Sequence, residues 1–573
     1  MTAQEMASSE SPSPAVNSQA KSAGRAGYVP LIVCAGLLLV GILLRVLRYL
    51  ANRPLWLDEA ALANNIRERT FAGLTRPLEW GQGAPIGFLW LEKSVCTVLG
   101  TSEFSLRLIP LIAGLLCLPL FYLVCRRLFG VLTANVGLSL FAVAESFIYY
   151  SSEVKQYSTD TLVALILVFL CLEAVRSERT VWLLVLGLCG LLGVFLSHPS
   201  IFVLGPIVVY LALVGGPSGK VLRRAAIVLA VLWAVGFLAN YFLFLAHLYR
   251  PDQGLVESNA SGFMPFPPRS LSDCKWYFTQ LFFVFKYIFS HPTGVGEQIG
   301  VGTPIAGLAA ALAIVGAVFV ARDSKPTLVI LLGPIALVLV ASALRKYPFA
   351  GRLILFLLPL LILLIAAGLT SPWVGSNRRQ RLAQVVMFAM LSLLPWLSAV
   401  NSTVRPPITE DVRPVFSYIQ QHRQPADLLY LYPGADKAFH FYRERFGLSQ
   451  MPFVSGQNVM RKAADKPVDL LALRGTKRAW IVFSFLGDRR GTTSEEELVL
   501  CLLDSMGQRL KQVAAEGASG YLYDLSGKVT CRDTIPARSG MPRGRGDRGS
   551  RDTDTFVGSD PVPVFEHENR NRI

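Results

Sequence analysis

Long apolar runs alternate with short polar loops over most of this chain. The runs lie at residues 28–50, 104–125, 131–149, 158–176, 181–197, 200–214, 224–246, 303–321, 327–344, 353–370 and 383–399. A helix needs about 20 apolar residues to cross the hydrocarbon core of a bilayer, with a range of about 17–25. The pattern therefore predicts an α-helical polytopic membrane protein with about 11 transmembrane helices.

Positive charges mark one side of this predicted bundle. Basic loops follow alternate spans, at residues 126–127, 176–179, 220–224, 322–325 and 378–381. Cytoplasmic loops carry an excess of Lys and Arg, so these loops predict a cytoplasmic N-terminus and an extracytoplasmic chain after about residue 400. We expect a multi-pass protein of the cell membrane, namely a bacterial inner membrane.

The first external loop, residues 51–103, determines whether this assignment holds. Residues 84–99 are apolar, and a crossing there would move every later basic loop to the outside. We therefore expect them to form a juxtamembrane or re-entrant segment, so that interfacial helices lie in this loop. The aromatic run at residues 276–289, within the long loop 247–302, resembles another interfacial helix.

Composition favours a membrane protein over a nucleic-acid-binding one. Of the 573 residues, 52% are hydrophobic and 16% are charged, whereas soluble proteins have about 25% charged residues. The formal net charge of +16 falls largely in short loops and in the C-terminal tail. Membrane orientation accounts for most of that excess, so we expect no nucleic-acid partner.

The chain changes character at both ends. Residues 28–400 form the predicted transmembrane domain, and residues 401–525 read as a small extracytoplasmic α/β domain. Its expected helices are at 411–422, 435–445 and 494–513, and its expected strands are at 428–432, 478–485 and 520–525. Residues 1–27, a cytoplasmic tail, and residues 526–573 are predicted to be disordered from their polar and small residues.

An adjacent pair of acids, Asp58 and Glu59, follows the first span in the stretch Arg53-Pro54-Leu55-Trp56-Leu57-Asp58-Glu59-Ala60. An ionised side chain in hydrocarbon costs several kcal/mol, so the pair belongs at a membrane boundary or beside a partner. The following residues have the spacing of a helix that lies on the bilayer. Neighbouring helical side chains point about 100° apart, so only one acid of the pair is expected to face a cavity.

Four pieces of sequence, taken in order, resemble the polyprenyl-phosphate-dependent glycosyltransferases of the C superfamily (GT-C), especially bacterial relatives of protein mannosyltransferases and of aminoarabinose transferase, in glycosyltransferase family 39. The pieces are Trp56-Leu57-Asp58-Glu59-Ala60; Gly83-Ala84-Pro85-Ile86-Gly87-Phe88-Leu89-Trp90 with Gly100 to Leu108; Tyr149-Tyr150-Ser151-Ser152-Glu153-Val154-Lys155-Gln156-Tyr157; and Arg345-Lys346-Tyr347-Pro348-Phe349-Ala350-Gly351-Arg352. In the third piece, Lys155 and Gln156 stand where Arg is common in the family. The resemblance covers about residues 28–400.

The resemblance implies a transfer reaction at the extracytoplasmic face. A sugar linked to a polyprenyl phosphate would be attacked by a lipid, glycan or protein acceptor of the cell envelope. Phosphate is a good leaving group, so one base and several cations should suffice. Asp58 would be the base. The other implied site residues are Glu59 and Glu153 as further catalytic candidates, Arg352, Arg345, Lys346 and Lys155 for the donor phosphate, and Trp56, Tyr157 and His198 in the substrate cavity.

Each assignment has a structural alternative. Asp58 or Glu59 could stabilise a helix N-terminus, and Glu153 could pair with Lys155. Arg352 could be an interfacial anchor, and His198 could belong to a simple His-Pro helix stop. Mg²⁺ or Mn²⁺ bound by Asp58, Glu59 and Glu153 is an open option, because hard cations prefer carboxylate oxygens.

Two arginines at the end of the first span, Arg45 and Arg48, are expected to snorkel to the interface, with contact to a lipid phosphate as the alternative. The rival functional classes are a transporter or lipid flippase, which predicts broken helices at mid-membrane, and a non-catalytic sensor with an external ligand-binding domain.

Overall fold

The computed structural model describes residues 14–177, 179–214, 219–246, 261–289, 302–375, 377–456, 468–484 and 495–527. Helix α1 (Pro14–Leu50) begins within the predicted tail 1–27, whose first 13 residues lie outside the described part. The predicted tail 526–573 lies outside it from residue 528. The described chain forms two compact units. We call them the membrane unit, which ends at Pro407, and the appended unit, which combines Pro54–Ala60 with the chain from Ile408.

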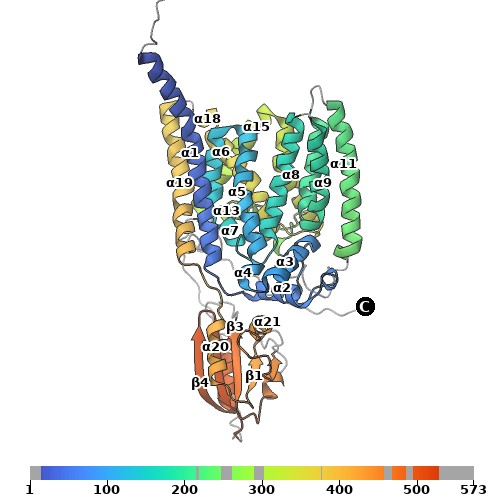
Figure 1. The fold of residues 1–573 in the computed structure, drawn as a ribbon, viewed down its shortest axis with the longest axis vertical. Helices are drawn as coiled ribbons and strands as arrows, with labels where there is room; N and C mark the ends of the chain where they lie inside the picture. Colours follow the sequence, from blue (N-terminus) through green and yellow to red (C-terminus); the bar gives the residue numbers. More distant parts are fainter. Residues whose placement is uncertain are drawn as a thin grey trace, which may run out of the picture. The chain divides into compact units, whose positions relative to one another are not determined.

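The membrane unit is a bundle of apolar helices (Figure 1). Eight described helices are long and apolar enough to cross a membrane, and three more are apolar but shorter. The long ones are α1, α5 (Leu108–Phe129), α8 (Tyr157–Ser177), α11 (Gly219–Asn240) with η2 (Tyr241–Leu245), α15 (Gly302–Asp323), α16 (Lys325–Ala343), η5 (Gly351–Leu357) with α17 (Leu358–Thr370), and α19 (Arg378–Val404). The shorter ones are α6 (Val131–Val143), α9 (Thr180–Leu196) and α10 (Ser200–Leu213). These helices correspond one to one with the predicted apolar runs, so the predicted fold class is confirmed.

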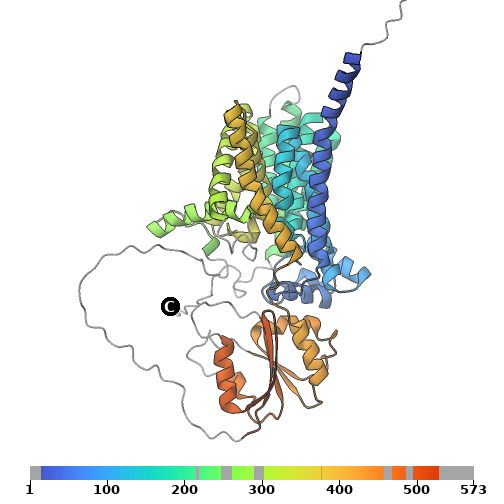
Figure 2. The ribbon, with the colours of Figure 1, turned by 90° about the vertical axis from the view of Figure 1, so that its left-hand side faces the viewer.

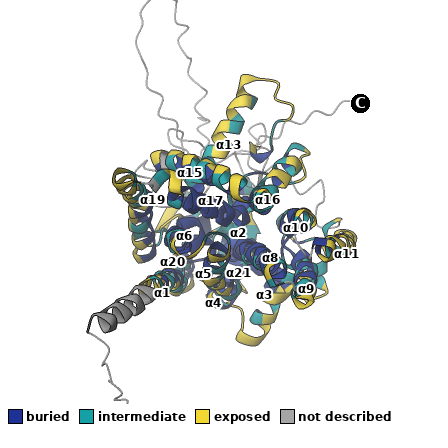
Figure 3. Cartoon of the chain, turned by 90° about the horizontal axis from the view of Figure 1, so that it is seen from above, coloured by how far each residue is buried: buried dark blue, intermediate teal, exposed yellow. Residues whose placement is uncertain are grey.

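Helix α17 lies at the centre of the bundle, where its residues are buried on all sides (Figure 3). A helix that is apolar all round is expected in such a position. Its closest neighbour is α15, and the two backbones approach at Gly316 and Gly368. A Cβ at Gly316 would lie 2.0 Å from the Leu364 carbonyl oxygen, and one at Gly368 would lie 2.0 Å from that of Leu312. Because these two glycines carry no side chains, the backbones of α15 and α17 can approach this closely.

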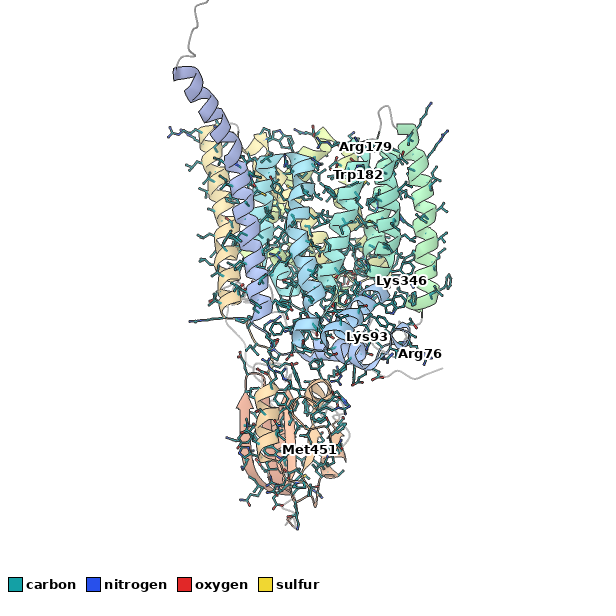
Figure 4. All side chains as sticks on the ribbon, viewed as in Figure 1. Arg76, Lys93, Arg179, Trp182, Lys346 and Met451 are labelled. Carbon is teal, nitrogen blue, oxygen red and sulfur yellow. The ribbon has the colours of Figure 1, made fainter. Side chains whose placement is uncertain are left out.

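The first loop folds into short helices, which belong to the membrane unit from Ala61 on. They are α2 (Leu57–Glu68), η1 (Gly73–Thr75), α3 (Ile86–Leu99) and α4 (Glu103–Leu106). Helix α3 has 14 residues, as many as α10, so its length does not distinguish it from the shorter apolar helices, and that residues 84–99 do not cross stays a prediction. Figure 4 shows Arg76, Lys93 and Lys346 near one end of the membrane unit and Arg179 with Trp182 at the opposite end. The basic loop 176–179 therefore lies away from the first loop, as the charge pattern predicts.

Helix α13 (Leu271–Phe289) is only partly the interfacial helix that its aromatic residues predict. Its first half extends away from the bundle, with Leu271 and Phe278 exposed (Figures 2 and 3). Its last turn is buried, including Tyr287 and Phe289, and belongs to the core of the membrane unit. The aromatic run therefore has one surface end and one core end.

Arg45 and Arg48 do not snorkel. Arg45 is 0% exposed and Arg48 is 2% exposed. Arg45 donates from Nη1 to the carbonyl oxygens of Gly41 and Ala142, and Arg48 donates to that of Ser402. The prediction is wrong because α5, α6 and α19 cover this part of α1 and supply backbone acceptors in place of water.

The appended unit contains a five-stranded mixed sheet with the order β2-β1-β3-β5-β4. Strands β1 (Leu428–Leu431), β2 (Phe453–Ser455) and β3 (Ala479–Ser484) are parallel, whereas β5 (Ala518–Asp524) pairs antiparallel with β3 and with β4 (Gln508–Ala515). Helix α23 (Glu495–Met506) covers one face, and α20 (Arg413–His422) and α21 (Pro433–Tyr442) cover the other (Figure 2). A short helix, α22 (Val468–Leu471), precedes β3.

Two features of this sheet differ from the prediction. The expected helix 494–513 ends at Met506, and the chain then forms β4, which pairs with β5 through a turn at Gly517. Gly517 has a φ of 66°, a value that favours glycine. Strand β2 was not predicted, because three residues are too short to show an alternating pattern.

Candidate active site

The connector between α7 (Glu145–Tyr150) and α8, residues 151–156, is the meeting point of the candidate site in the membrane unit. All six of its residues are buried, although they include Glu153 and Lys155. Buried charges in a membrane bundle are costly unless they are paired, and they commonly mark functional sites. The contacts of this connector therefore identify what the site is made of.

Lys155 joins the connector to the first loop. Its Nζ donates a hydrogen bond to Oε1 of Gln82 at 2.6 Å, and both side chains are buried. Gln82 immediately precedes the predicted piece that begins at Gly83. The residue just before the second piece is thus in direct contact with the third piece.

Arg352, in the fourth piece, contacts Tyr157 at the end of the third piece. Its guanidinium lies over the Tyr157 ring, 5.6 Å from the ring centroid, and Gly351 before it has a φ of 47°. The Tyr157 ring also meets the Tyr150 ring edge-on at 5.2 Å. The hydroxyl of Tyr150 is hydrogen-bonded to that of Tyr287 at 2.6 Å.

Glu153 and Arg352 both lie close enough to the Tyr150 and Tyr287 hydroxyls to act on them electrostatically. The cluster therefore combines one carboxylate, two cations and three tyrosines within an apolar bundle. We call Glu153, Lys155, Tyr157 and Arg352, with Tyr150, Tyr287 and Gln82, the connector cluster.

Arg53 ties the start of the acidic stretch to the connector. Its Nη2 donates to the Ser152 carbonyl oxygen at 3.2 Å, and its own carbonyl accepts from Nη1 of Arg107 at 2.6 Å. The guanidiniums of Arg48 and Arg53 each lie about 5 Å from the centroid of the Tyr149 ring, at 4.9 and 5.0 Å. Such cation–π contacts stabilise charges that are removed from water.

The other predicted residues of the membrane unit are not in these contacts. Arg345 and Lys346 are exposed, and the Arg345 guanidinium lies 5.9 Å from the centroid of the Phe263 ring. His198 lies between α9 and α10, and its Nε2 is buried without a hydrogen-bond partner. Loss of hydration lowers the pKa of His198 to about 4, so it is neutral at physiological pH.

The acidic segment, Pro54–Ala60, is described with the appended unit. Trp56 and Asp58 are partly buried, and Glu59 is fully buried. The Trp56 backbone N–H donates to Oε2 of Glu59 at 3.4 Å, the reciprocal interaction of a capping box at the start of α2. Asp58 instead lies close to Lys437 of α21. The two acids thus make different interactions.

Residues 83–245 match the sequence profile of the family described as "Dolichyl-phosphate-mannose-protein mannosyltransferase". This range contains the second and third predicted pieces and Lys155. Over these residues the membrane unit is similar to lipid-phosphate-dependent mannosyltransferases. The resemblance found in the sequence is therefore confirmed, as is the assignment of the chain to a membrane glycosyltransferase class.

Solved structures support the glycosyltransferase fold over most of the chain. ArnT from Cupriavidus metallidurans, bound to undecaprenyl phosphate, matches with a TM-score of 0.51 and 16% identity over 87% of this chain and 98% of that one. The apo oligosaccharyltransferase of Archaeoglobus fulgidus matches with a TM-score of 0.51 and 12% identity over 80% of this chain and 70% of that one. No curated protein matches the sequence significantly.

Metal binding gains no support from the side chains of this glycosyltransferase. Among the residues that the structure describes, no group of three His, Cys, Asp or Glu side chains could hold a metal ion.

Three residues of the site were not predicted from the sequence: Gln82, Tyr287, and Arg53 in its contact with the Ser152 carbonyl oxygen. Gln82 carries no motif of its own. The helical spacing of Val284, Tyr287 and Ile288 was the available signal for a buried face on α13.

Proposed function

We propose that this protein transfers a sugar from a polyprenyl-phosphate donor to an acceptor at the extracytoplasmic face, by a single displacement with Asp58 as base. The acceptor hydroxyl oxygen bonds to the anomeric carbon while the bond from that carbon to the phosphate oxygen breaks. The lipid phosphate leaves with the bonding electrons, and the acceptor proton passes to the Asp58 carboxylate. The family match of residues 83–245 and the undecaprenyl phosphate bound to ArnT support a lipid-phosphate donor.

The observation that carries this proposal is the connector cluster. Lys155 and Arg352, two cations from segments almost 200 residues apart, gather beside Glu153 in an apolar environment. Guanidinium and ammonium groups bind phosphate oxygens through charge-assisted hydrogen bonds. In our proposal Arg352 and Lys155 hold the donor phosphate and stabilise it as it leaves. Arg345 and Lys346, which are exposed, contribute attraction at longer range.

The remaining residues have supporting roles in the proposal. Glu153 orients the cations, and Tyr157 supports Arg352 through its ring face. Trp56 and His198 line the substrate cavity, with His198 as a neutral hydrogen-bonding group. Glu59 fixes the first turn of α2, which leaves Asp58 as the base. A base in this role contributes typically about 10²–10⁴-fold to the rate.

A direct assay tests the proposal. Purified protein in detergent or vesicles is given a radiolabelled polyprenyl-phosphate sugar and membrane extract as a source of acceptor. Radiolabel that has moved from the polyprenyl phosphate to an acceptor is then separated by chromatography and counted. We expect transfer by the wild type and a loss of about 10²–10⁴-fold in Asp58→Asn with donor binding retained. Movement of intact donor across vesicles without transfer would favour a flippase. Unchanged transfer by Asp58→Asn would show that another group is the base.

A further inference from the structure

The appended unit contains an open α/β sheet with parallel strands at its centre. Its parallel strands β1 and β3 are adjacent, and the chain moves from β1 to β2 on one side and returns to β3 on the other. In open α/β sheets, ligands bind beyond the carboxyl ends of the strands at the point where the strand order reverses. That point lies beyond Leu431 and Ser484, the last residues of β1 and β3.

The acidic segment of this same chain is held at that edge. The Leu55 backbone N–H donates to the Tyr442 hydroxyl of α21 at 3.1 Å. The Leu57 backbone N–H donates to the Glu410 carboxylate, whose Oε2 also accepts from the Ser484 hydroxyl at 3.0 Å. Tyr442 and Glu410 are buried. Two backbone groups that flank Trp56 are thus fixed by side chains of the appended unit.

Charge at this edge is arranged around Asp58. Lys437, the fifth residue of α21, is close to Asp58, Asp436 and Glu410, and Asp58 has the strongest effect of the three carboxylates. Burial lowers the pKa of Lys437, and these carboxylates oppose that shift. Glu59 also lies close to Glu410. Lys437 therefore supplies a positive charge beside a group of four acids, of which Glu59 and Glu410 are buried and Asp58 and Asp436 are partly buried.

We propose that Lys437 is a positioning residue for Asp58, and that the appended unit acts as a holder for the acidic segment. This inference rests on the proposed function in one respect, namely that Asp58 is the base. An ammonium group close to a carboxylate favours its ionised form, and a general base must be ionised to accept a proton. Lys437 thus keeps Asp58 in its reactive form, while Tyr442 and Glu410 fix the backbone on either side of Trp56.

The experiment compares Lys437→Gln, Lys437→Arg and a control, Lys511→Gln, in the full-length protein. Lys511 lies on β4 and is exposed. The first readout is hydrogen–deuterium exchange of the peptide that covers residues 54–60, which needs no substrate. The second readout is the pH profile of kcat/KM for sugar transfer, which reports the ionisation of the free enzyme.

We expect Lys437→Gln to speed exchange in the 54–60 peptide at least threefold and to move the acidic limb of the pH profile upward by about half a unit or more. Lys437→Arg should restore most of both effects, and Lys511→Gln should match the wild type. Equal behaviour of Lys437→Gln and Lys511→Gln in both readouts would overturn the inference. If the wild type transfers no sugar, the proposed function fails, and the exchange measurement still decides whether Lys437 holds the segment.

Discussion

Lys155 donates its hydrogen bond to Gln82 across 73 residues of sequence, and the 2.6 Å contact is buried. The bond fixes an ammonium group at one point of the connector cluster without neutralising its charge, because an amide oxygen is an uncharged acceptor. A carboxylate in place of the amide would instead cancel the charge. The Gln82 amide thus holds the Lys155 ammonium without adding a second carboxylate beside it, as the phosphate-binding role proposed for Lys155 requires.

Lys155→Gln should raise KM for the lipid-phosphate donor roughly 10- to 100-fold, because a hydrogen bond to a charged group contributes about 1.5–3 kcal/mol. Gln82→Glu should have an effect in the same direction, since the new carboxylate pairs with Lys155. The measurement is steady-state kinetics with varied donor. Lys220→Gln, at an exposed position, is the control. If Gln82→Glu left KM for the donor unchanged, the role of Lys155 would be in packing and not in donor binding.

Arg352→Gln should lower kcat/KM for transfer by about 10²-fold, because the guanidinium is the proposed bidentate ligand of the phosphate. Arg352→Lys should recover only a small part, since an ammonium group binds as a point charge. Arg345→Gln and Lys346→Gln should have weaker effects, because both side chains are exposed and charge interactions there are screened. Arg379→Gln, which is exposed, controls for net charge. Full activity of Arg352→Lys would argue against bidentate binding.

Glu59 and Asp58 should respond differently to the loss of charge. Glu59→Gln keeps an oxygen that can accept from the Trp56 N–H, and glutamine is also found at this capping position. We expect it to retain transfer within about threefold, in contrast to the loss of at least about 10²-fold in Asp58→Asn. Glu59→Ala should lower the apparent Tm, because a lost helix cap costs about 1 kcal/mol. If Glu59→Gln were as inactive as Asp58→Asn, Glu59 would share the catalytic role.

The sequence predicted the parts of the fold that depend on local composition. The apolar runs located each described helix that is apolar and of membrane length or somewhat shorter, whereas the non-crossing of residues 84–99 stays a prediction from the charge of the loops. The end of α23 was placed incorrectly, because Gln508–Ala515 contains good helix formers such as Gln, Leu and Lys, and pairing with β5 overrides that preference. Local propensity cannot show which partner strand is available.

The site was predictable only where motifs carried it. Glu153, Lys155, Tyr157 and Arg352 were named from the resemblance, and the structure groups them. Gln82 and Tyr287 join that group through contacts between segments 73 and 137 residues apart, which no single stretch of sequence records. The burial of Arg48 depends in the same way on α19, which supplies the Ser402 carbonyl oxygen.

The crossing of α15 and α17 predicts a strong effect of a single methyl group. Gly316→Ala would place a Cβ 2.0 Å from the Leu364 carbonyl oxygen, so the helices must separate. Such overpacking costs typically about 1–3 kcal/mol or more, and we expect a clear fall in the apparent Tm in detergent. Gly307→Ala on the same helix meets nothing within 4 Å and should leave the Tm unchanged or raise it. Equal Tm values for the two variants would contradict this packing.

The stability of the appended unit should depend on pH through Glu410. Burial raises the pKa of Glu410 from 4.5 to about 7, so the folded state holds this proton more firmly than the unfolded state does. The contribution of Glu410 is therefore complete below about pH 4.5 and is lost as the pH rises to about 7. Glu410→Gln cannot ionise, and it should reduce the fall in apparent Tm between about pH 5 and pH 8 by a few degrees. Thermal unfolding of the full-length protein at both values measures this. Glu516→Gln, at an exposed turn position, should show the same difference in apparent Tm between the two pH values as the wild type. If Glu410→Gln also kept that difference, the pH dependence would belong to another group.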